Sequence, residues 1–281
     1  MDNSRRKELS IIATNIRKDI ITEVYANKSG HPGGSLSIAD VLTYLYFEEM
    51  NVDPKNPSCP TRDRFVLSKG HCAPGLYAAL AEKGYFPKED LTGFRKFGSY
   101  LQGHPSIKDT PGVDMSSGSL GQGISVACGM AKSAKIFGDT YRVYTIIGDG
   151  EMEEGQVWEA AMFAAHYKLD NLCALLDLNG LQIDGKIADV MSPYPLREKF
   201  ESFGCHVIEI DGHDLDQIEA AYQQARQTKG MPTMIVSHSV KGKGVSYMEN
   251  QASWHGTAPN EEQYRQAMAE LDATLAKWEV E

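Results

Sequence analysis

Thr145-Ile146-Ile147-Gly148-Asp149-Gly150 places an acidic residue between two glycines at the end of a short apolar run. Thirty residues after Asp149, Asn179 follows a second apolar run in Leu175-Leu176-Asp177-Leu178-Asn179-Gly180. Each stretch is typical of a buried strand that ends in a turn. A single strand–helix–strand crossover returns the chain to the same edge of a parallel sheet, so we expect Asp149 and Asn179 to lie together at the carboxyl ends of neighbouring strands.

A carboxylate, an amide oxygen and a nearby backbone carbonyl are the oxygen ligands that suit Mg²⁺, which keeps its other positions for water or phosphate oxygens. We expect a helix to open after Gly150, and its free N–H groups and positive end favour an anion. These features predict a diphosphate bridged to the protein by the metal. Taken singly, Gly-Asp-Gly and Asn-Gly are more often plain turns; their matching positions at two strand ends favour the site.

Outward from these turns, short apolar runs alternate with segments of helical periodicity, which predicts an α/β fold with a parallel sheet and helices on both faces. The expected strands are 64–67, 143–147, 172–178, 206–210 and 233–237. The expected helices are 5–26, 36–47, 72–82, 121–136, 156–167, 196–203, 215–227 and 261–278. No repeat or linker divides the chain, so we expect residues 1–281 to form one domain. The Gly-, Pro- and Ser-rich stretch 98–118 is expected to be a long functional loop.

Composition narrows the class of protein further. The 281 residues carry 28 basic and 38 acidic side chains, a net charge of −10, which disfavours nucleic acid and anionic membranes as partners. The five cysteines form no Cys-x-x-Cys pair, so neither a disulfide framework nor a zinc cage is indicated. The apolar runs are far shorter than the ~20 residues of a membrane span. A cytoplasmic protein is the simplest expectation.

The two turns belong to a longer series of motifs that resembles the thiamine-diphosphate motif of transketolases. The series comprises Ser29-Gly30-His31-Pro32, Ser68-Lys69-Gly70-His71, Gly103-His104-Pro105, Gly118-Ser119-Leu120-Gly121-Gln122-Gly123, Gly148-Asp149-Gly150, Glu154-Gly155-Gln156-Val157-Trp158-Glu159-Ala160, Leu169-Asp170-Asn171-Leu172, Asp177-Leu178-Asn179-Gly180-Leu181-Gln182-Ile183-Asp184-Gly185, Lys241-Gly242-Lys243-Gly244 and Ser253-Trp254-His255-Gly256. Full-length transketolases continue into a pyrimidine-binding domain and a further C-terminal domain. The sequence therefore resembles the separately encoded N-terminal, diphosphate-binding subunit of a split transketolase.

The resemblance implies an enzyme that moves a two-carbon ketol unit from a ketose phosphate to an aldose phosphate, using thiamine diphosphate and Mg²⁺. In this family a glutamate of the pyrimidine-binding domain activates the cofactor. We therefore expect this chain to be inert alone and to need a separate C-terminal subunit, in an assembly of two of each chain. The face that meets the partner should carry an exposed apolar patch.

The resemblance also implies roles for individual residues. The catalytic residues would be His31, His104 and His255. The cofactor would be bound by His71, Gly118, Ser119, Leu120, Asp149, Gly150, Asn179, Lys241 and His255. The metal would be bound by Asp149, Asn179 and Leu181.

Other interpretations of these residues stay open. The glycines of 118–123 also suit a helix that packs closely against a neighbour, and Lys241 also suits a solvated lysine. Some relatives carry a cofactor-contacting serine where this chain has Gly34, followed by Ser35, so a contact from that loop is in question. The remaining histidines are expected to be structural or surface residues: His166, His206, His213 and His238.

Two other functions compete with the transketolase interpretation. The α subunit of a 2-oxo-acid dehydrogenase shares the Gly-Asp-Gly to Asn spacing, but the flanks of His31, His71 and His104 favour sugar chemistry. A non-catalytic cofactor-binding protein that lacks a partner is the third possibility.

Overall fold

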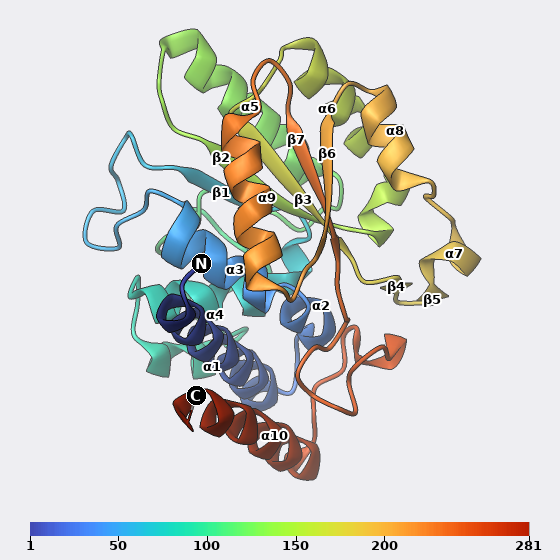
Figure 1. The fold of residues 1–281 in the computed structure, drawn as a ribbon. Coiled ribbons are helices and arrows are strands. Elements are labelled where there is room, and N and C mark those ends of the chain that lie inside the picture. The colour runs from blue at the N-terminus through green and yellow to red at the C-terminus, as the bar shows by residue number, and fades with distance from the viewer. Residues whose placement is uncertain (281) are drawn as a thin grey trace.

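A five-stranded parallel sheet lies at the centre of the computed structural model, which describes residues 1–280 (Figure 1). Its strand order is β1-β2-β3-β7-β6, and every neighbouring pair is parallel. The strands are β1 (Arg64–Leu67), β2 (Val143–Gly148), β3 (Leu172–Leu178), β6 (His206–Asp211) and β7 (Thr233–His238). The predicted α/β class and its parallel sheet are confirmed.

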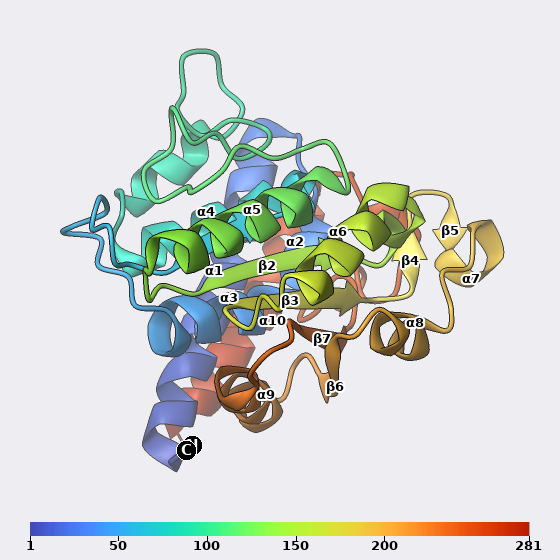
Figure 2. The same cartoon turned by 90° about the horizontal axis from the view of Figure 1, so that it is seen from above.

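Helices cover both faces of this sheet, with α5 and α6 on one side and α9 on the other (Figure 2). The longer helices are α1 (Asn3–Asn27), α4 (Ala73–Lys83), α5 (Gln122–Phe137), α6 (Gly155–His166), α8 (Leu196–Ser202), α9 (Leu215–Gln227) and α10 (Glu261–Val280). All of them lie close to the predicted ranges. None of the helices in residues 1–280 combines the length and apolar character that crossing a bilayer requires.

Strand β2 shows why the sheet is buried on both faces. Tyr144 and Ile146 pack into a core cluster that includes residues of α1, α4 and α9. Val143 and Ile147 point the other way, into a cluster with residues of α5 and α6. Successive strand residues face opposite sides, so a nearly continuous apolar run is what a doubly covered parallel strand requires.

Helices α1 and α10 lie side by side and bring the two ends of the chain together (Figure 1). The rings of Tyr25 and Tyr264 stack with centroids 4.2 Å apart, and Lys18 pairs with Asp272 at 2.6 Å. Helices α1 and α10 thus contribute to the same hydrophobic core.

The prediction of one helix over 36–47 is wrong. The segment forms α2 (Pro32–Leu36), α3 (Ala39–Tyr44) and a wider π turn at Leu45–Glu49. The break falls at Ser37, whose hydroxyl lies 2.7 Å from a carboxylate oxygen of Asp177 in β3 and 2.9 Å from the Gly34 carbonyl. This long-range contact under the sheet edge interrupts a helix that local periodicity favours.

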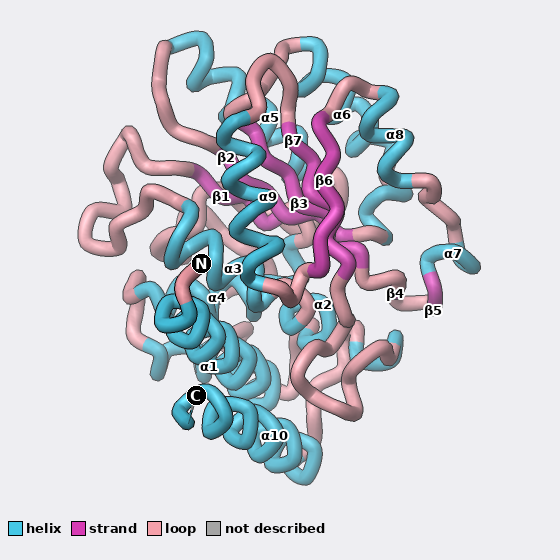
Figure 3. The backbone as a smooth tube through the Cα atoms, in the orientation of Figure 1, coloured by secondary structure: helices cyan, strands magenta, loops and turns pink. Residues whose placement is uncertain are grey.

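Two irregular segments matter for the site. The stretch 98–118 contains neither helix nor strand, as expected. A small hairpin that the sequence did not reveal, β4 (Leu181–Gln182) and β5 (Gly185–Lys186), follows β3 and leads to the short helix α7 (Ile187–Val190) (Figure 3).

Glu23 of α1 gives a stability prediction. Its side chain is fully buried, and neither carboxylate oxygen has a hydrogen-bond partner within the described residues. Burial, and then the nearby Asp19, raise the pKa of Glu23 well above its usual range. The native chain therefore holds a neutral carboxyl that the unfolded chain ionises above about pH 4.3, so stability is lost as pH rises from there toward the folded pKa.

We expect Glu23→Gln to raise the free energy of unfolding at pH 8 by about 1–3 kcal/mol, since each unit of pKa difference is worth about 1.4 kcal/mol. The gain should vanish near pH 4, where both states hold a neutral side chain. Urea denaturation at pH 8 and at pH 4 measures this difference in the free energy of unfolding. An equal effect at both would show that ionisation is not the cause.

Candidate active site

Asp149 and Asn179 lie together at the carboxyl edge of the sheet, as the two strand ends predicted. Gly148 of β2 lies opposite Asp177 of β3 in the sheet register. The Asp149 carboxylate is 3% exposed and accepts hydrogen bonds from the N–H groups of Gly150 (2.9 Å) and Gly180 (2.5 Å). One carboxylate therefore joins the turn after β2 to the turn after β3.

Helix α6 lies close to its predicted range, but the residues directly after Gly150 do not open it as expected. Residues Gly150–Glu153 form a short 3₁₀ turn, and α6 begins only at Gly155. The reason is Glu151, whose buried carboxylate accepts from Ser68 Oγ (2.5 Å) and from the N–H groups of Gly121 (2.7 Å) and Gly148 (3.0 Å). Glu151 thereby ties β1 and the start of α5 to the turn after β2. Its importance was not visible in the sequence.

Lys69 and Asp177 form a second buried pair beneath the site, also not foreseen. The Lys69 ammonium donates to Asp177 Oδ2 (2.5 Å) and to the Gly34 carbonyl (2.9 Å). Burial acts against both charges, yet their mutual attraction raises the pKa of Lys69 and lowers that of Asp177. Asp177 also accepts from Asn179 Nδ2 (2.9 Å), and the Asn179 oxygen in turn accepts from the Leu181 N–H (3.2 Å). Asp177 precedes Asn179 by two positions, and residues two apart in an extended chain point to the same side. This spacing could have indicated that the two side chains lie together.

A cavity of about 300 Å³ opens above these residues. Most of the predicted site residues line it: His31, His71, Gly118, Leu120, Asp149, Gly150, Asn179, Leu181, Lys241 and His255. Gly34, Lys69 and Glu151 line it as well. The neighbouring Ser35 does not, because its hydroxyl donates to the His31 carbonyl (2.7 Å). Seven separate stretches of the chain thus converge on one cavity: 31–34, 69–71, 118–120, 148–151, 179–184, Lys241 and His255.

His104 and Ser119 lie outside that lining. The backbone of Gly118 has φ of +150°, and a Cβ there would lie 3.1 Å from the His104 ring. The ring therefore packs directly over Gly118, which itself lines the cavity, while Tyr77 Oη donates to the His104 carbonyl (3.1 Å). Ser119 is exposed. Gly123 has the packing role considered for this segment, because a Cβ would lie 2.5 Å from Ser68 Cα.

Three imidazoles form one cluster at the cavity. Ring centroids are 5.1 Å apart for His31 and His71, 5.1 Å for His71 and His255, and 5.4 Å for His31 and His255. Burial lowers the pKa of His31 and His71 to about 4 and that of His255 to about 3. The next largest cause is the neighbouring His71 ring for His31, the Lys69 charge for His71 and the Lys241 charge for His255. Burial also lowers the pKa of His104. All four histidines are therefore neutral near pH 7.

We expect this cluster to stay neutral during acid titration. In ¹⁵N-edited NMR of the imidazoles, His31, His71 and His255 should keep neutral-form shifts down to about pH 5, whereas the urea-unfolded chain titrates near 6.5. Because the folded pKa values lie below the unfolded ones, stability should fall as pH drops from about 6.5 toward 4. Folded-state midpoints above 6 for these three residues would contradict the burial argument.

Lys241 is 2% exposed and donates to the Leu181 carbonyl at 3.0 Å. Burial lowers its pKa. The alternative of a solvated lysine in a flexible loop is therefore wrong: the side chain lies inside the cavity wall.

The remaining histidines have structural or surface surroundings. His213 bonds to Asp40 and to a backbone amide, His238 lies 2.9 Å from Glu209 at the surface, and the His166 ring contacts Tyr167. His206 lies at the start of β6, and its Nε2 has no partner within the described residues. None of the four lines the cavity.

These observations define a class of protein: a parallel α/β domain whose strand ends present oxygen ligands, buried lysines and neutral imidazoles to one anionic ligand. The model of the family described as transketolase, thiamine diphosphate binding domain, matches residues 9–280. The chain belongs to this family. The transketolase resemblance is thereby confirmed.

The proteins that match this chain fall into two groups by length. The chain is 49% identical to the 6-deoxy-6-sulfo-D-fructose transketolase subunit SqwG of Clostridium sp. (strain MSTE9), over 92% of this chain and 94% of the relative. It is 44% identical to one subunit of the apulose-4-phosphate transketolase of Phocaeicola vulgatus, over 94% of each. A transketolase mutant structure from Pichia stipitis superposes with a TM-score of 0.90 at 30% identity, over 97% of this chain and 43% of that one. The chain thus spans nearly all of the subunit relatives and less than half of the longer enzyme, which confirms the N-terminal subunit type and the transferase class.

Proposed function

We propose that this chain is the diphosphate-binding half of a two-chain transketolase, which transfers a ketol unit from a ketose phosphate to an aldose phosphate with thiamine diphosphate and Mg²⁺. The observation that carries the proposal is the convergence of Asp149, Asn179 and Lys241 on one cavity at the carboxyl edge of the sheet. Open α/β sheets bind their ligands at this edge. The family membership supports thiamine diphosphate as the cofactor, and the cavity supports its binding at this edge.

The residues present fit a magnesium ion. The Asp149 carboxylate, the Asn179 amide oxygen and the Leu181 carbonyl line the cavity and are hard oxygen ligands. Burial, and then the Asp177 charge, raise the pKa of Asp149 to about 6, and a cation beside it would offset both effects.

The same cavity fits an anionic cofactor. Lys241 contributes a buried positive charge, and its ammonium now donates to the Leu181 carbonyl that we assign to the metal. Two cations repel each other at one carbonyl, so metal binding should turn the Lys241 side chain toward the diphosphate. Nδ1 of both His31 and His255 is buried without a partner among the described residues, which a ligand would supply.

Thiamine diphosphate, when bound, stabilises the carbanion of the transferred unit. The chain's own residues then have the task of handling protons. We assign His31, His104 and His255 to the hydroxyl and carbonyl oxygens of the sugar, because a neutral imidazole can accept a proton at one nitrogen and donate at the other. His71, Gly118, Ser119, Leu120 and Gly150 would contact the cofactor.

The partner would be a separate pyrimidine-binding chain, in an assembly of two of each. The names of two relatives, which describe each as a subunit, support a second chain. Exposed apolar side chains also support a covered face: Ile136 and Phe137 end α5, and Met162, Phe163 and Tyr167 lie on α6 and just beyond. All five cysteines are free, which agrees with a cytoplasmic location. We keep residues 1–281 as one domain in this proposal.

The test is a substrate panel on the chain mixed with a pyrimidine-binding partner. We expect ketol transfer from one or more ketose phosphates or from 6-deoxy-6-sulfo-D-fructose, with aldose phosphates as acceptors. Decarboxylation of 2-oxo acids without ketol transfer would instead support the dehydrogenase interpretation. Cofactor binding with no turnover on any substrate would support a non-catalytic protein.

A further inference from the structure

The loop that carries Lys241 has little structure of its own. Between β7 and α10 the described chain contains only the 3₁₀ turn Ala252–Trp254 (Figure 3). No sheet ladder fixes the backbone beside Lys241. Its position depends on a few backbone hydrogen bonds, from the Gly242 N–H to the Gly33 carbonyl (2.9 Å) and from the Asn250 N–H to the Lys241 carbonyl (2.9 Å), and on side chains from elsewhere in the fold.

Two such side chains hold the backbone on either side of Lys241. His213 Nε2 accepts the Val240 N–H at 2.9 Å, and Arg17 Nε donates to the Lys243 carbonyl at 3.2 Å. His213 follows β6, whereas Arg17 belongs to α1. The anchors thus reach the loop from segments that lie 27 and 226 positions away in the sequence.

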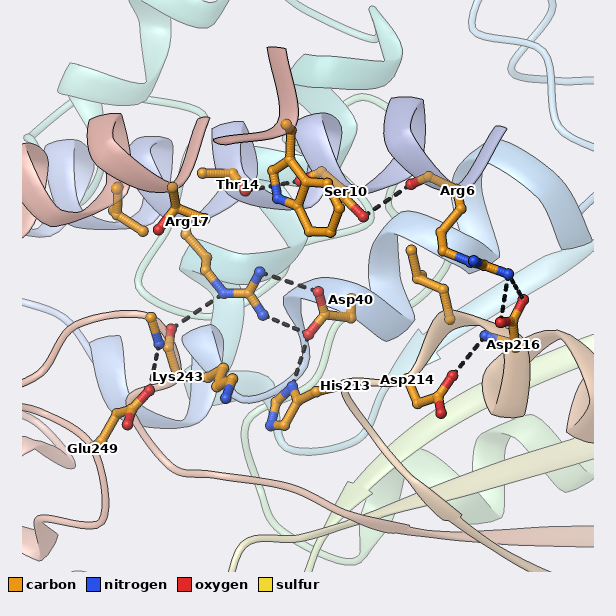
Figure 4. A pocket seen from close by; sticks show the side chains of 15 residues that line it. Arg6, Ser10, Thr14, Arg17, Asp40, His213, Asp214, Asp216, Lys243 and Glu249 are labelled. Atoms are coloured by element: carbon orange, nitrogen blue, oxygen red, sulfur yellow. Dashed lines mark hydrogen bonds and ion pairs between the residues drawn. The ribbon is translucent and has the colours of Figure 1, made fainter. Parts of the chain in front are cut away.

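Asp40 of α3 connects the two anchors (Figure 4). Its carboxylate accepts from both terminal nitrogens of Arg17, at 3.1 and 2.5 Å, and lies 2.7 Å from His213 Nδ1. The side chains of Arg17, Asp40 and His213 are 9%, 11% and 12% exposed. A bidentate guanidinium–carboxylate pair at such burial is rigid and orientation-specific.

The hydrogen bonds also determine which ring nitrogen of His213 carries the proton. Because Nε2 accepts from a backbone N–H, it carries no proton, so the proton of the neutral ring is on Nδ1 and is donated to Asp40. Burial alone would raise the pKa of Asp40, but Arg17 and His213 hold this pKa well below its usual range. The carboxylate is therefore available to orient both anchors at once.

None of these three residues touches the cofactor cavity. They line a different cavity of about 580 Å³, between α1, α9, α10 and the Lys241 loop, and no lining residue is common to the two cavities. Most charged side chains of this larger cavity pair with one another, including Arg6 with Asp216 at 2.6 Å (Figure 4). Arg17 and Asp40 reach the cofactor cavity only indirectly, and His213 also lines a third cavity with Asn179 and Gly180, so the loop has to be tested separately through Lys241.

We propose that Arg17, Asp40 and His213 are positioning residues that hold the Lys241 loop against the diphosphate end of the cofactor cavity. The inference rests on the proposed function, because it assigns the loop to diphosphate binding. It predicts a loss of cofactor affinity, through Lys241, without a loss of the chemical step.

Calorimetric titration of the full chain with thiamine diphosphate at saturating Mg²⁺ tests the proposal. His213→Leu removes both hydrogen bonds and should weaken binding about tenfold or more, the equivalent of about 1.4 kcal/mol. His213→Gln keeps one acceptor and one donor and should restore much of the affinity. His238→Leu is the matched control, a histidine at the end of β7 paired with Glu209, and should bind as the unmodified chain does.

A double-mutant cycle separates positioning from general structural damage. In a Lys241→Met background, His213→Leu should weaken binding by no more than about twofold, because the group it positions is gone. The same loss in both backgrounds would overturn the proposal. In the reconstituted enzyme, His213→Leu should raise the cofactor concentration for half-activity while kcat at saturation stays within about twofold.

A measurement on the unmodified, cofactor-free chain covers the case in which His213→Leu does not fold. The Val240 amide should exchange slowly with solvent, because it is bonded to a buried imidazole. Exchange at the unprotected rate would show that the anchor does not exist. Absence of Mg²⁺-dependent binding by the unmodified chain would overturn the proposed function, whereas normal binding with unchanged affinity in His213→Leu would overturn this inference alone.

Discussion

Replacing Asp149 with alanine is expected to abolish Mg²⁺-dependent binding of thiamine diphosphate. The substitution removes the charged ligand of the metal and the carboxylate that links the turns after β2 and β3. Changes to residues that only support metal ligands already cost about 10–100-fold in affinity, so we expect a loss of at least about 100-fold here. The fold should survive, because the sheet beneath the site is held by two apolar clusters.

Calorimetry with and without Mg²⁺ measures the effect, and circular dichroism checks the fold. Asp189→Ala, which removes an exposed carboxylate from α7, is the matched control and should leave binding unchanged. Asn179→Ala should weaken binding in the same direction but less, since an uncharged ligand is lost. Unchanged affinity in Asp149→Ala would disprove the assignment of the metal site.

Replacing His104 with alanine is expected to separate catalysis from binding. The ring packs over Gly118 but does not line the cofactor cavity, so cofactor affinity should change little. Loss of a positioned acid–base group lowers turnover by about 10²–10⁴-fold, and we expect kcat of the reconstituted enzyme to fall by at least about 100-fold.

His166→Ala on α6 is the control, since His166 lies outside the cavity. Parallel measurements of kcat and of the cofactor dissociation constant decide the matter. A cofactor affinity that falls as far as turnover would show that His104 supports the binding site rather than the reaction.

The sequence predicted those parts of the site that depend on strand ends. Asp149 and Asn179 follow apolar runs that one crossover separates. Because the two strands pair in parallel, their carboxyl ends lie at the same edge of the sheet. The histidines in glycine- and proline-flanked turns could be recognised because their motifs resemble those of transketolases. Strand positions were predicted well because burial on both faces requires a continuous apolar run.

Contacts between distant segments could not be predicted in this way. Lys69 and Asp177 are 108 positions apart, and only the folded sheet edge shows that they pair. Nothing in the sequence around Glu151 indicates its role, yet its carboxylate accepts hydrogen bonds from Ser68 Oγ and from the N–H groups of Gly121 and Gly148. The same limit explains the break at Ser37, where a long-range hydrogen bond outweighs local helical periodicity.

His213 was expected to be a structural or surface residue. An Asp-Gly-His-Asp turn indicates a structural histidine, and the structure agrees that it lies outside the cofactor cavity. Its partner Asp40 is 173 positions away, so its connection to the Lys241 loop depends on how α1, α3 and β6 pack.

The most direct test of the account is ketol transfer by the purified chain, with thiamine diphosphate and Mg²⁺ present, before and after addition of a pyrimidine-binding partner. We expect no transfer by this chain alone, because half of the cofactor site belongs to the partner. Activity should appear on mixing and saturate as the partner approaches an equimolar amount, and the cofactor should bind more tightly in the complex by linkage. Robust ketol transfer by the 281-residue chain on its own would contradict the half-enzyme account.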